Sequence, residues 1–237
     1  MKRRKLHVVW LWGLLFLMTA CGDDDDYYYP SVKLEFVTVK AGADGLIQSL
    51  LPDKGELLTV AKDRTGSTIS PNSARRVISN YEVNSEDATA VIYSLQSVVT
   101  PEPKEADDPA FEGGLKYDPV DVTSIWLGRD YLNMILNVKI NINSGKQHVF
   151  GMIEESVESE GDETVVTLSL FHDANGDEEN YNRRAYISVP LTKYVDEENP
   201  HQTIRIKFKY HTTDKNGVVV ESSKYCDPGF EYVPGVN

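Results

Sequence analysis

Strict two-residue alternation is the sequence feature that most constrains how this chain folds. In residues 203–210, TIRIKFKY, apolar and basic side chains alternate without a break. In an extended strand, successive side chains point to opposite faces, so the apolar face of this segment is continuous. A helix would scatter the same residues around its circumference. The pattern therefore predicts an antiparallel strand with one buried and one solvated face.

The same period recurs through residues 120–237. In residues 134–142, MILNVKINI, every second side chain is apolar, and the segments 147–156, 164–172 and 183–191 are also rich in apolar and β-branched residues. About six short strands at close spacing are typical of a β-sandwich. We expect one hairpin between 134–142 and 147–156, turning at Ser144-Gly145, and a second pair between 164–172 and 183–191.

Residues 31–100 contain a second group of strands. Five segments alternate or carry dense apolar residues: SVKLEF, GLIQSLLPD, ELLTVAKD, RRVISNYEV and ATAVIYSLQSVV. Five strands in about 70 residues are the count and size of a small Greek-key barrel such as an OB-fold. In the first segment the alternation slips between Phe36 and Val37, which predicts a bulge or a bend between sheets.

Residues 101–119 interrupt the strand pattern. This stretch, PEPKEADDPAFEGGLKYDP, holds four prolines, two glycines and several acidic residues. We interpret it as a Pro-rich linker between a barrel at 31–100 and a sandwich at 120–237; a long loop within one domain is the alternative. The predicted fold class is all-β, an OB-like barrel followed by an antiparallel sandwich.

The amino terminus has the layout of a secretory signal peptide over residues 1–20. A basic KRRK precedes an apolar run, VVWLWGLLFLM, that is shorter than the ~20 residues of a membrane-spanning helix. Small residues then lead to Cys21, and MTAC resembles a bacterial lipobox, which implies that Cys21 is the lipid attachment site. An uncleaved anchor, or a cysteine that stands there by coincidence, is the alternative. Several acyl chains on one residue would anchor the mature chain stably in a membrane.

Residues 21–30 are interpreted as a lipidated acidic tether. The cysteine is followed by Gly22 and by four aspartates, Asp23, Asp24, Asp25 and Asp26, which repel one another and stay solvated. A cysteine followed by such a run resembles the export signal of Bacteroides-type lipoproteins, which implies a lipid-anchored protein of the outer membrane, exposed on the cell surface. A plain spacer, or an anchor facing the periplasm, is the alternative.

The charge of the chain bears on its partners. Formal net charge is −13, and four of its positive charges lie in the segment that we expect to be removed. Nucleic-acid binding requires a basic patch that neutralises phosphates, so we expect no nucleic-acid partner. Tyr81 and Tyr93 lie in barrel strands and are assigned to packing rather than to base stacking. An unknown envelope protein or extracellular ligand is the expected partner, besides the membrane itself.

Motifs for catalysis and cofactor binding are absent from the sequence. It has no G-x-S-x-G, P-loop, G-x-G-x-x-G or H-E-x-x-H, and we predict that the protein is not an enzyme. His148 and His172 are assigned to strands with ordinary hydrogen bonds. Cys226 is assigned as a partly buried, inert thiol, with a reactive thiol or an intermolecular disulfide as the alternatives.

One acidic loop has the composition of a cation site. Residues 172–182, HDANGDEENYN, place oxygen-bearing side chains at alternate positions. Calcium takes several oxygen ligands, so this loop is a candidate calcium site. Glu178 stands where an EF-hand requires glycine, and the alternative is a solvated loop that turns at Asn175-Gly176. The candidate ligands are Asp173, Asn175, Asp177 and Glu179; no other cofactor is expected.

Taken in order, these parts resemble a known family. The lipobox, the acidic run, the barrel, the Pro-rich break and the sandwich are similar to those of the NigD-like lipoproteins of Bacteroides-type bacteria. The segments that carry the resemblance are LLTVAKD, VIYSLQSV and TIRIKFKY. The resemblance implies an OB-like domain, a β-sandwich and a bacteriocin immunity role, and supplies no catalytic residues. We expect a surface-anchored, non-enzymatic binding or accessory protein, with bacteriocin immunity and a glycan-binding or glycan-processing role as alternatives.

Overall fold

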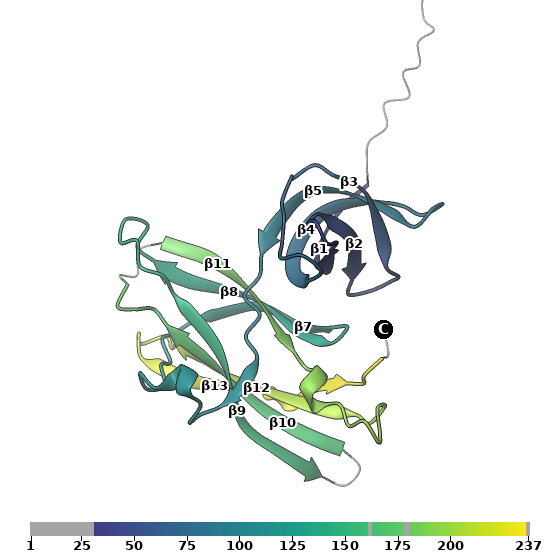
Figure 1. Ribbon diagram of the computed structural model, residues 1–237. Helices are drawn as coiled ribbons and strands as arrows, with labels where there is room; N and C mark the ends of the chain where they lie inside the picture. Colours follow the sequence, from purple (N-terminus) through teal and green to yellow (C-terminus); the bar gives the residue numbers. More distant parts are fainter. Residues whose placement is uncertain (1–30, 161–162, 178–180, 236–237) are drawn as a thin grey trace, which may run out of the picture. The chain divides into compact units, whose positions relative to one another are not determined.

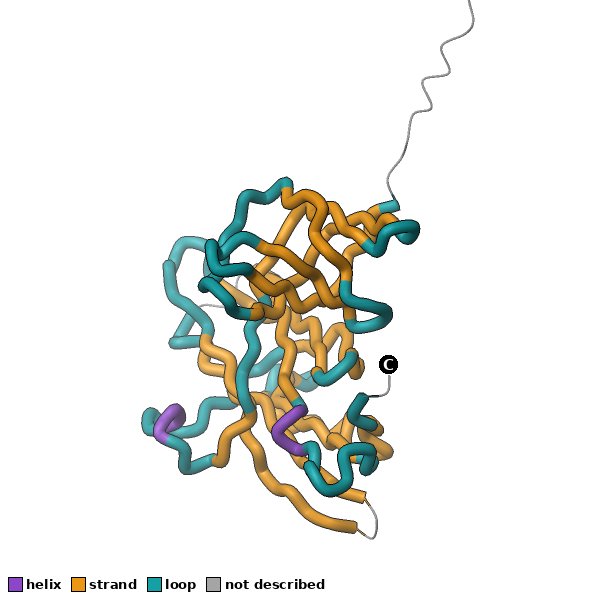
Figure 2. The backbone as a smooth tube through the Cα atoms, turned by 45° about the vertical axis from the view of Figure 1, so that its right-hand side comes forward, coloured by secondary structure: helices purple, strands orange, loops and turns teal. Residues whose placement is uncertain are grey.

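Thirteen strands make up nearly all of the regular structure in the described part of the chain (Figures 1 and 2). The structure is a computed structural model, and it describes residues 31–160, 163–177 and 181–235. Two short 3-10 helices, η1 (Pro109–Phe111) and η2 (Thr192–Tyr194), are the helical segments of these ranges. The all-β prediction is confirmed.

The first five strands close into a barrel with the strand order β1-β2-β3-β5-β4. They match the five segments predicted from the sequence. Antiparallel pairs join β1 to β2 and β4, and β4 to β5, whereas β3 and β5 run parallel. The strands are β1 (Val32–Ala41), β2 (Ile47–Pro52), β3 (Leu58–Asp63), β4 (Ala74–Asn84) and β5 (Thr89–Ser97).

Both faces of β1 are buried at its centre, and this corrects the predicted bulge. The register between β1 and β4 runs without a shift from Val32 to Lys40. Val37 and Val39 point into the barrel core, whereas Phe36 packs on the outside of the barrel against Trp126 and Tyr186 of the sandwich. The slip in alternation therefore marks a strand with an apolar neighbour on each face. The bulge lies later, at Lys40/Ala41.

The remaining strands form two sheets with one core between them. One sheet has the order β11-β8-β7 and the other the order β13-β12-β10-β9-β6. The fully buried side chains of the core include Leu132, Leu136, Leu168, Ile206 and Phe208. The strands are β6 (Pro103–Glu105), β7 (Asp121–Gly128), β8 (Tyr131–Ile140), β9 (Val149–Glu160), β10 (Glu163–Asp173), β11 (Tyr181–Pro190), β12 (Ile204–Thr213) and β13 (Val219–Tyr232).

The predicted pairings within the sandwich were wrong. β8 and β9 lie in different sheets, so the expected hairpin between them does not form. β9 instead pairs with β10, and β11 crosses over to pair with β8. The five-stranded sheet also contains two parallel pairs, β10 with β12 and β6 with β9. Alternation identifies strands and their buried faces, but it does not carry the identity of the partner strand.

The stretch 101–119 is part of the sandwich rather than a separate linker. Its strand β6 pairs in parallel with β9, and Phe111 is buried in a small cluster with Ile153 and Phe171. The backbone of Pro103 has no N–H to donate, which suits its place in the outermost strand of the sheet. The predicted boundary at residue 120 is therefore moved toward residue 100.

Candidate functional site

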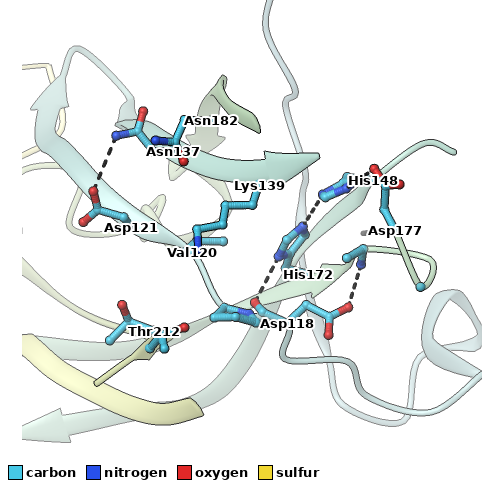
Figure 3. A pocket seen from close by; sticks show the side chains of 14 residues that line it. Asp118, Val120, Asp121, Asn137, Lys139, His148, His172, Asp177, Asn182 and Thr212 are labelled. Carbon is cyan, nitrogen blue, oxygen red and sulfur yellow. Dashed lines mark hydrogen bonds and ion pairs between the residues drawn. The ribbon is translucent and has the colours of Figure 1, made fainter. Parts of the chain in front are cut away.

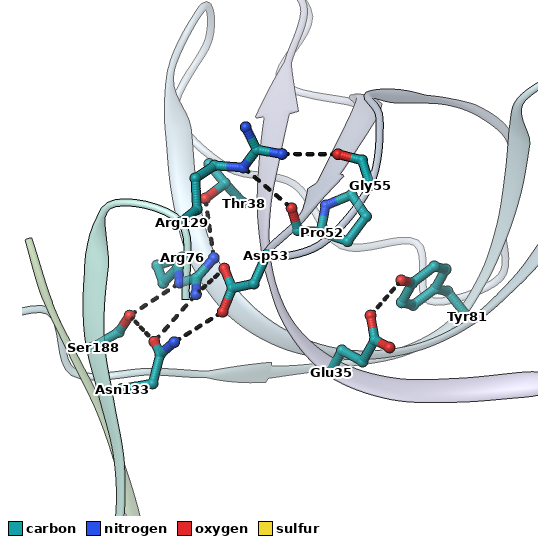
Figure 4. A network of polar contacts seen from close by, with 10 residues as sticks. All are labelled: Glu35, Thr38, Pro52, Asp53, Gly55, Arg76, Tyr81, Arg129, Asn133 and Ser188. Atoms are coloured by element: carbon teal, nitrogen blue, oxygen red, sulfur yellow. Dashed lines mark hydrogen bonds and ion pairs between the residues drawn. The ribbon is translucent and has the colours of Figure 1, made fainter. Parts of the chain in front are cut away.

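A buried polar network joins the barrel to the sandwich, and Arg76 of β4 is its centre (Figure 4). Its Nε donates to Ser188 Oγ at 3.0 Å, and its Nη2 donates to Asn133 Oδ1 at 3.1 Å and to Asp53. Nη1 reaches Thr38 Oγ1 at 3.4 Å. The side chain of Arg76 is only 2% exposed, and the carboxylate of Asp53 neutralises its charge.

The partners of Arg76 also bind one another. Ser188 Oγ donates to Asn133 Oδ1 at 2.6 Å, and Asn133 Nδ2 donates to Asp53 Oδ2 at 2.8 Å. A buried charge is tolerated only when it is paired and hydrogen-bonded, as here. The network thus fixes how β2 and β4 of the barrel meet β8 and β11 of the sandwich. These groups stabilise the fold, and their side-chain polar atoms bind one another.

An aromatic cleft of about 390 Å³ lies beside this network. The Phe36 ring stands edge-on to Trp126 with ring centroids 5.3 Å apart, and Tyr186 stands at 6.2 Å from Phe36. Leu34, at the mouth, is 66% exposed. Such clefts between domains, apolar with a few polar groups, are typical places for ligands to bind. Its lining also includes Glu35, Asp53, Lys54, Ile78, Gln96, Leu127, Gly128, Ile135 and Arg184.

A second, polar cavity of about 380 Å³ is lined by residues of the sandwich, several of which are labelled in Figure 3. Its central feature is a chain of hydrogen bonds through two imidazoles. His172 Nδ1 lies 3.0 Å from the carbonyl oxygen of Asp118, and His172 Nε2 lies 2.9 Å from His148 Nδ1. His148 Nε2 lies 3.4 Å from Asp177 Oδ2. The ring of His172 also stacks on Phe150, with centroids 4.7 Å apart.

The direction of each hydrogen bond in this series follows from the group at its end, the carbonyl oxygen of Asp118. A carbonyl oxygen only accepts, so His172 must donate from Nδ1 to Asp118. Burial lowers the pKa of His172, because the charged imidazolium would lose its hydration. In the neutral ring Nε2 then accepts a hydrogen bond from His148 Nδ1. On its other side, His148 Nε2 faces the carboxylate of Asp177, which also accepts the backbone N–H of Asn141 at 2.9 Å.

The candidate calcium ligands within the described residues, Asp173, Asn175 and Asp177, are not gathered around one point. Asp177 is 1% exposed and faces His148, whereas Asp173 Oδ1 accepts the backbone N–H of Asn175 at 2.7 Å. Asn175 and Gly176 have positive φ and form the turn, as the alternative interpretation predicts. Within the described ranges, no group of three or more His, Cys, Asp or Glu residues could hold a metal ion. Glu179 lies outside those ranges.

Of the other residues singled out in the sequence, the structure describes Cys226, Tyr81 and Tyr93. Cys21, Gly22 and Asp23–Asp26 lie outside the described residues, so the lipid and export assignments stay predictions. Cys226 is partly buried, burial raises the pKa of its thiol, and the thiol lies 3.6 Å from the carbonyl oxygen of Phe208. Tyr81 is fully buried in the barrel core and Tyr93 donates to Glu82 at 2.7 Å, so both pack as predicted.

Sequence reasoning missed the contact between His148 and His172 because they are 24 residues apart and no motif joins them. The pairing of β9 with β10 places Phe150 opposite His172, which brings His148 to the same end of the hairpin. Recognising that hairpin in the sequence would have predicted the contact. Arg76 carried no comparable signal, since its neighbour Arg75 is exposed and the sequence does not distinguish them.

Two protein-family models match this chain and show the family to which it belongs. Residues 36–98 match the NigD-like N-terminal OB domain, and residues 103–222 match the NigD-like C-terminal beta sandwich domain. The chain belongs to the NigD-like family. The resemblance seen in the sequence is thereby confirmed, and the second match begins at the residue that opens β6.

Solved structures extend the comparison for this NigD-like chain. It is 70% identical to a NigD-like immunity protein from Bacteroides caccae ATCC 43185, with a TM-score of 0.78 over 88% of this chain and 100% of that chain. A protein of unknown function from Bacteroides vulgatus ATCC 8482 shares the fold at 18% identity, with a TM-score of 0.59 and coverage of 87% and 96%.

A third structure that shares the fold is a protein from Bacteroides fragilis NCTC 9343 named as a candidate lipoprotein. It is 11% identical, with a TM-score of 0.58 over 87% of this chain and 100% of that one. A search of curated proteins found no match. None of the helices in the described residues has the length and apolarity needed to cross a membrane.

Proposed function

We propose that this NigD-like protein is a non-enzymatic binding protein that is anchored to the outer membrane through lipidated Cys21 and exposed on the cell surface. The aromatic cleft between Phe36, Trp126 and Tyr186 is the observation that carries the proposal. Phe36 is buried beneath Trp126 and Tyr186, and these two partly exposed rings offer apolar contact area at little cost in side-chain entropy, which suits the recognition of a ligand rather than its chemical conversion.

The titratable groups around the cleft also favour binding over catalysis. The carboxylate of Asp53 is held by Arg76 and Asn133, and Glu35 accepts the hydroxyl of Tyr81 at 2.8 Å. A general acid or base must be within reach of a substrate proton and change its protonation state during the reaction. Here the two acids of the cleft serve as fixed acceptors for neighbouring protein groups.

Immunity against a proteinaceous toxin is the specific form that we favour. The relative from Bacteroides caccae, 70% identical to this chain, is named an immunity protein. In that role the cleft would receive an apolar segment of the toxin at the cell surface, before the toxin reaches the membrane. Glycan binding in the cleft is the competing form of the same binding function.

A challenge assay tests this proposal. A strain lacking the gene is exposed to the secreted toxin of a producing strain and complemented with wild type, Leu34→Asp or Leu57→Asp. Both leucines are exposed, at 66% and 50%, but only Leu34 lines the cleft. We expect wild type and Leu57→Asp to restore protection and Leu34→Asp to lose it. Unchanged sensitivity of the deletion strain would reject immunity, and equal protection by both variants would reject the cleft.

A further inference from the structure

β11 is an edge strand with one open side. It pairs with β8 along ten positions, from Tyr181 to Pro190. On its other side it meets only a single bridge, at Val99. There the N–H of Val99 donates to Tyr186 O at 2.9 Å, and the N–H of Ser188 donates to Val99 O at 2.9 Å.

These two bonds show which backbone groups of β11 face the open side. The N–H and C=O of one strand residue point to the same side, and that side alternates along the strand. Because Tyr186 and Ser188 face away from β8, Asn182 and Arg184 do so as well. Within the described ranges no strand pairs with them. Before Val99 the chain turns into β5, whose Ser97 pairs with Val77 inside the barrel.

A cavity of about 540 Å³ lies beside the open side of β11, where the chain before Val99 leaves this strand for β5. Its floor is apolar, with Val138 and Ile140 from β8 and Phe150 from β9, whereas Tyr186 of β11 lines it from the opposite face of the sheet. At its rim, Val99 is 40% exposed and Ile142 is 67% exposed. An unpaired strand edge beside an apolar floor is a template for an added strand.

The charge of this groove is opposite to that of the whole chain. Its lining contains Lys146, Arg183 and Arg184 and no aspartate or glutamate, in a protein with a net charge of −13. Lys146 donates to the carbonyl oxygen of Gly176 and forms no ion pair among the described residues, and neither do the two arginines. The groove therefore complements an acidic partner.

We infer that an extended polypeptide segment with alternating apolar and acidic side chains binds here as an added strand on β11. Its backbone would bond to Asn182 and Arg184, its apolar side chains would cover Phe150 and Ile140, and its carboxylates, on the opposite face, would meet Arg184. This inference rests on the proposed binding function and names the chemistry of the partner. Gln96, Arg184 and Tyr186 also line the aromatic cleft, so the groove and the cleft adjoin.

The test uses the purified full chain and a labelled probe peptide of four Val-Glu repeats, blocked by proline at both ends. Fluorescence anisotropy measures its Kd. We expect saturable binding that the double variant Arg183→Glu/Arg184→Glu weakens by at least about tenfold. The matched control, Lys40→Glu/Lys215→Glu, makes the same change of charge at exposed positions outside the groove and should bind as wild type does.

Two further probes separate strand addition from charge attraction. A peptide that is N-methylated at alternate residues keeps every charge but loses backbone donors, and we expect it to bind much more weakly. A Val-Lys peptide should not bind. Charged residues on an edge strand also discourage self-pairing, and if that is the whole role of the arginines, wild type will not bind the probe and a neutral double variant, Arg183→Ala/Arg184→Ala, will self-associate.

The peptide-binding assay and the toxin-challenge assay separate failure of the groove from failure of the proposed function. Absence of probe binding to wild type, or equal binding of the methylated peptide, overturns strand addition. Stronger binding of an acidic polysaccharide than of the peptide overturns the polypeptide partner. If the peptide binds as expected but the deletion strain keeps its resistance to toxin, the groove stands and immunity fails.

Discussion

Arg76 of the barrel donates a hydrogen bond of 3.0 Å from Nε to the hydroxyl of Ser188, which lies 112 residues later in the sandwich. This bond joins strands that share no backbone pairing, so its geometry depends on the polar network around it. The stability of the protein should therefore depend both on the charge of Arg76 and on the space that Gly128 leaves for the network.

Loss of Arg76 should destabilise the whole described unit. Arg76→Met keeps much of the side-chain volume but leaves the carboxylate of Asp53, only 14% exposed, without its cation. Breaking a buried pair from one side costs about 3–5 kcal/mol. Urea unfolding should show this loss, while Arg75→Met, at the exposed neighbour, should change the free energy of unfolding by less than about 1 kcal/mol. Equal effects of the two would show that the network contributes little.

Gly128 leaves the space that the network needs. A Cβ at this position would overlap the carboxylate of Asp53 and the amide of Asn133. Gly128→Ala should therefore cost about 1–3 kcal/mol, as overpacking does. Gly113→Ala is the matched control, because nothing lies within 4 Å of the Cβ that it would add. Thermal unfolding of the two variants measures the difference, and an unshifted Tm for Gly128→Ala would contradict this account.

The sequence predicted elements well and their partners poorly. The five barrel strands and the buried face of residues 203–210 follow from local alternation, which any single strand displays. Whether β9 pairs with β8 or with β10 depends on contacts between segments, and alternation contains no such information. The slip at Phe36 was informative in another way, because it reflected a second apolar neighbour rather than a bulge.

The sites were harder to predict for the same reason. Arg76 and Asn133 come from two strands and Asp53 from the residue that follows β2; the fold alone brings them together, and each is an ordinary surface residue type. His148 and His172 meet through a hairpin that the sequence analysis paired differently. At these sites only the turn at Asn175-Gly176 could be predicted from neighbouring residues alone, because Asn and Gly both favour positive φ.

Stability should fall in mild acid because of His172. Burial lowers its pKa in the folded state below the unfolded value of about 6.5. As pH falls through about 6.5, the unfolded chain gains a proton that the folded chain resists, so the free energy of unfolding decreases. Chemical unfolding at pH values of about 7.5 and 5.5 measures this loss. His172→Gln should reduce it, and His201→Gln, at an exposed histidine, should leave it unchanged.

Asp177 should behave as a structural acceptor rather than as a calcium ligand. Its buried carboxylate accepts the N–H of Asn141 and faces His148, so Asp177→Ala, which leaves that N–H without its acceptor, should cost about 1–3 kcal/mol, the range for a hydrogen-bonding group that loses its partner. Asp173→Asn keeps an oxygen that can accept the N–H of Asn175, and should change stability by less than about 0.5 kcal/mol. Because calcium needs six to eight oxygen ligands, added calcium should leave the Tm of the wild type unchanged. A rise in Tm that disappears in Asp177→Ala would instead establish the loop as a calcium site, with Asp177 turned away from His148 toward the ion.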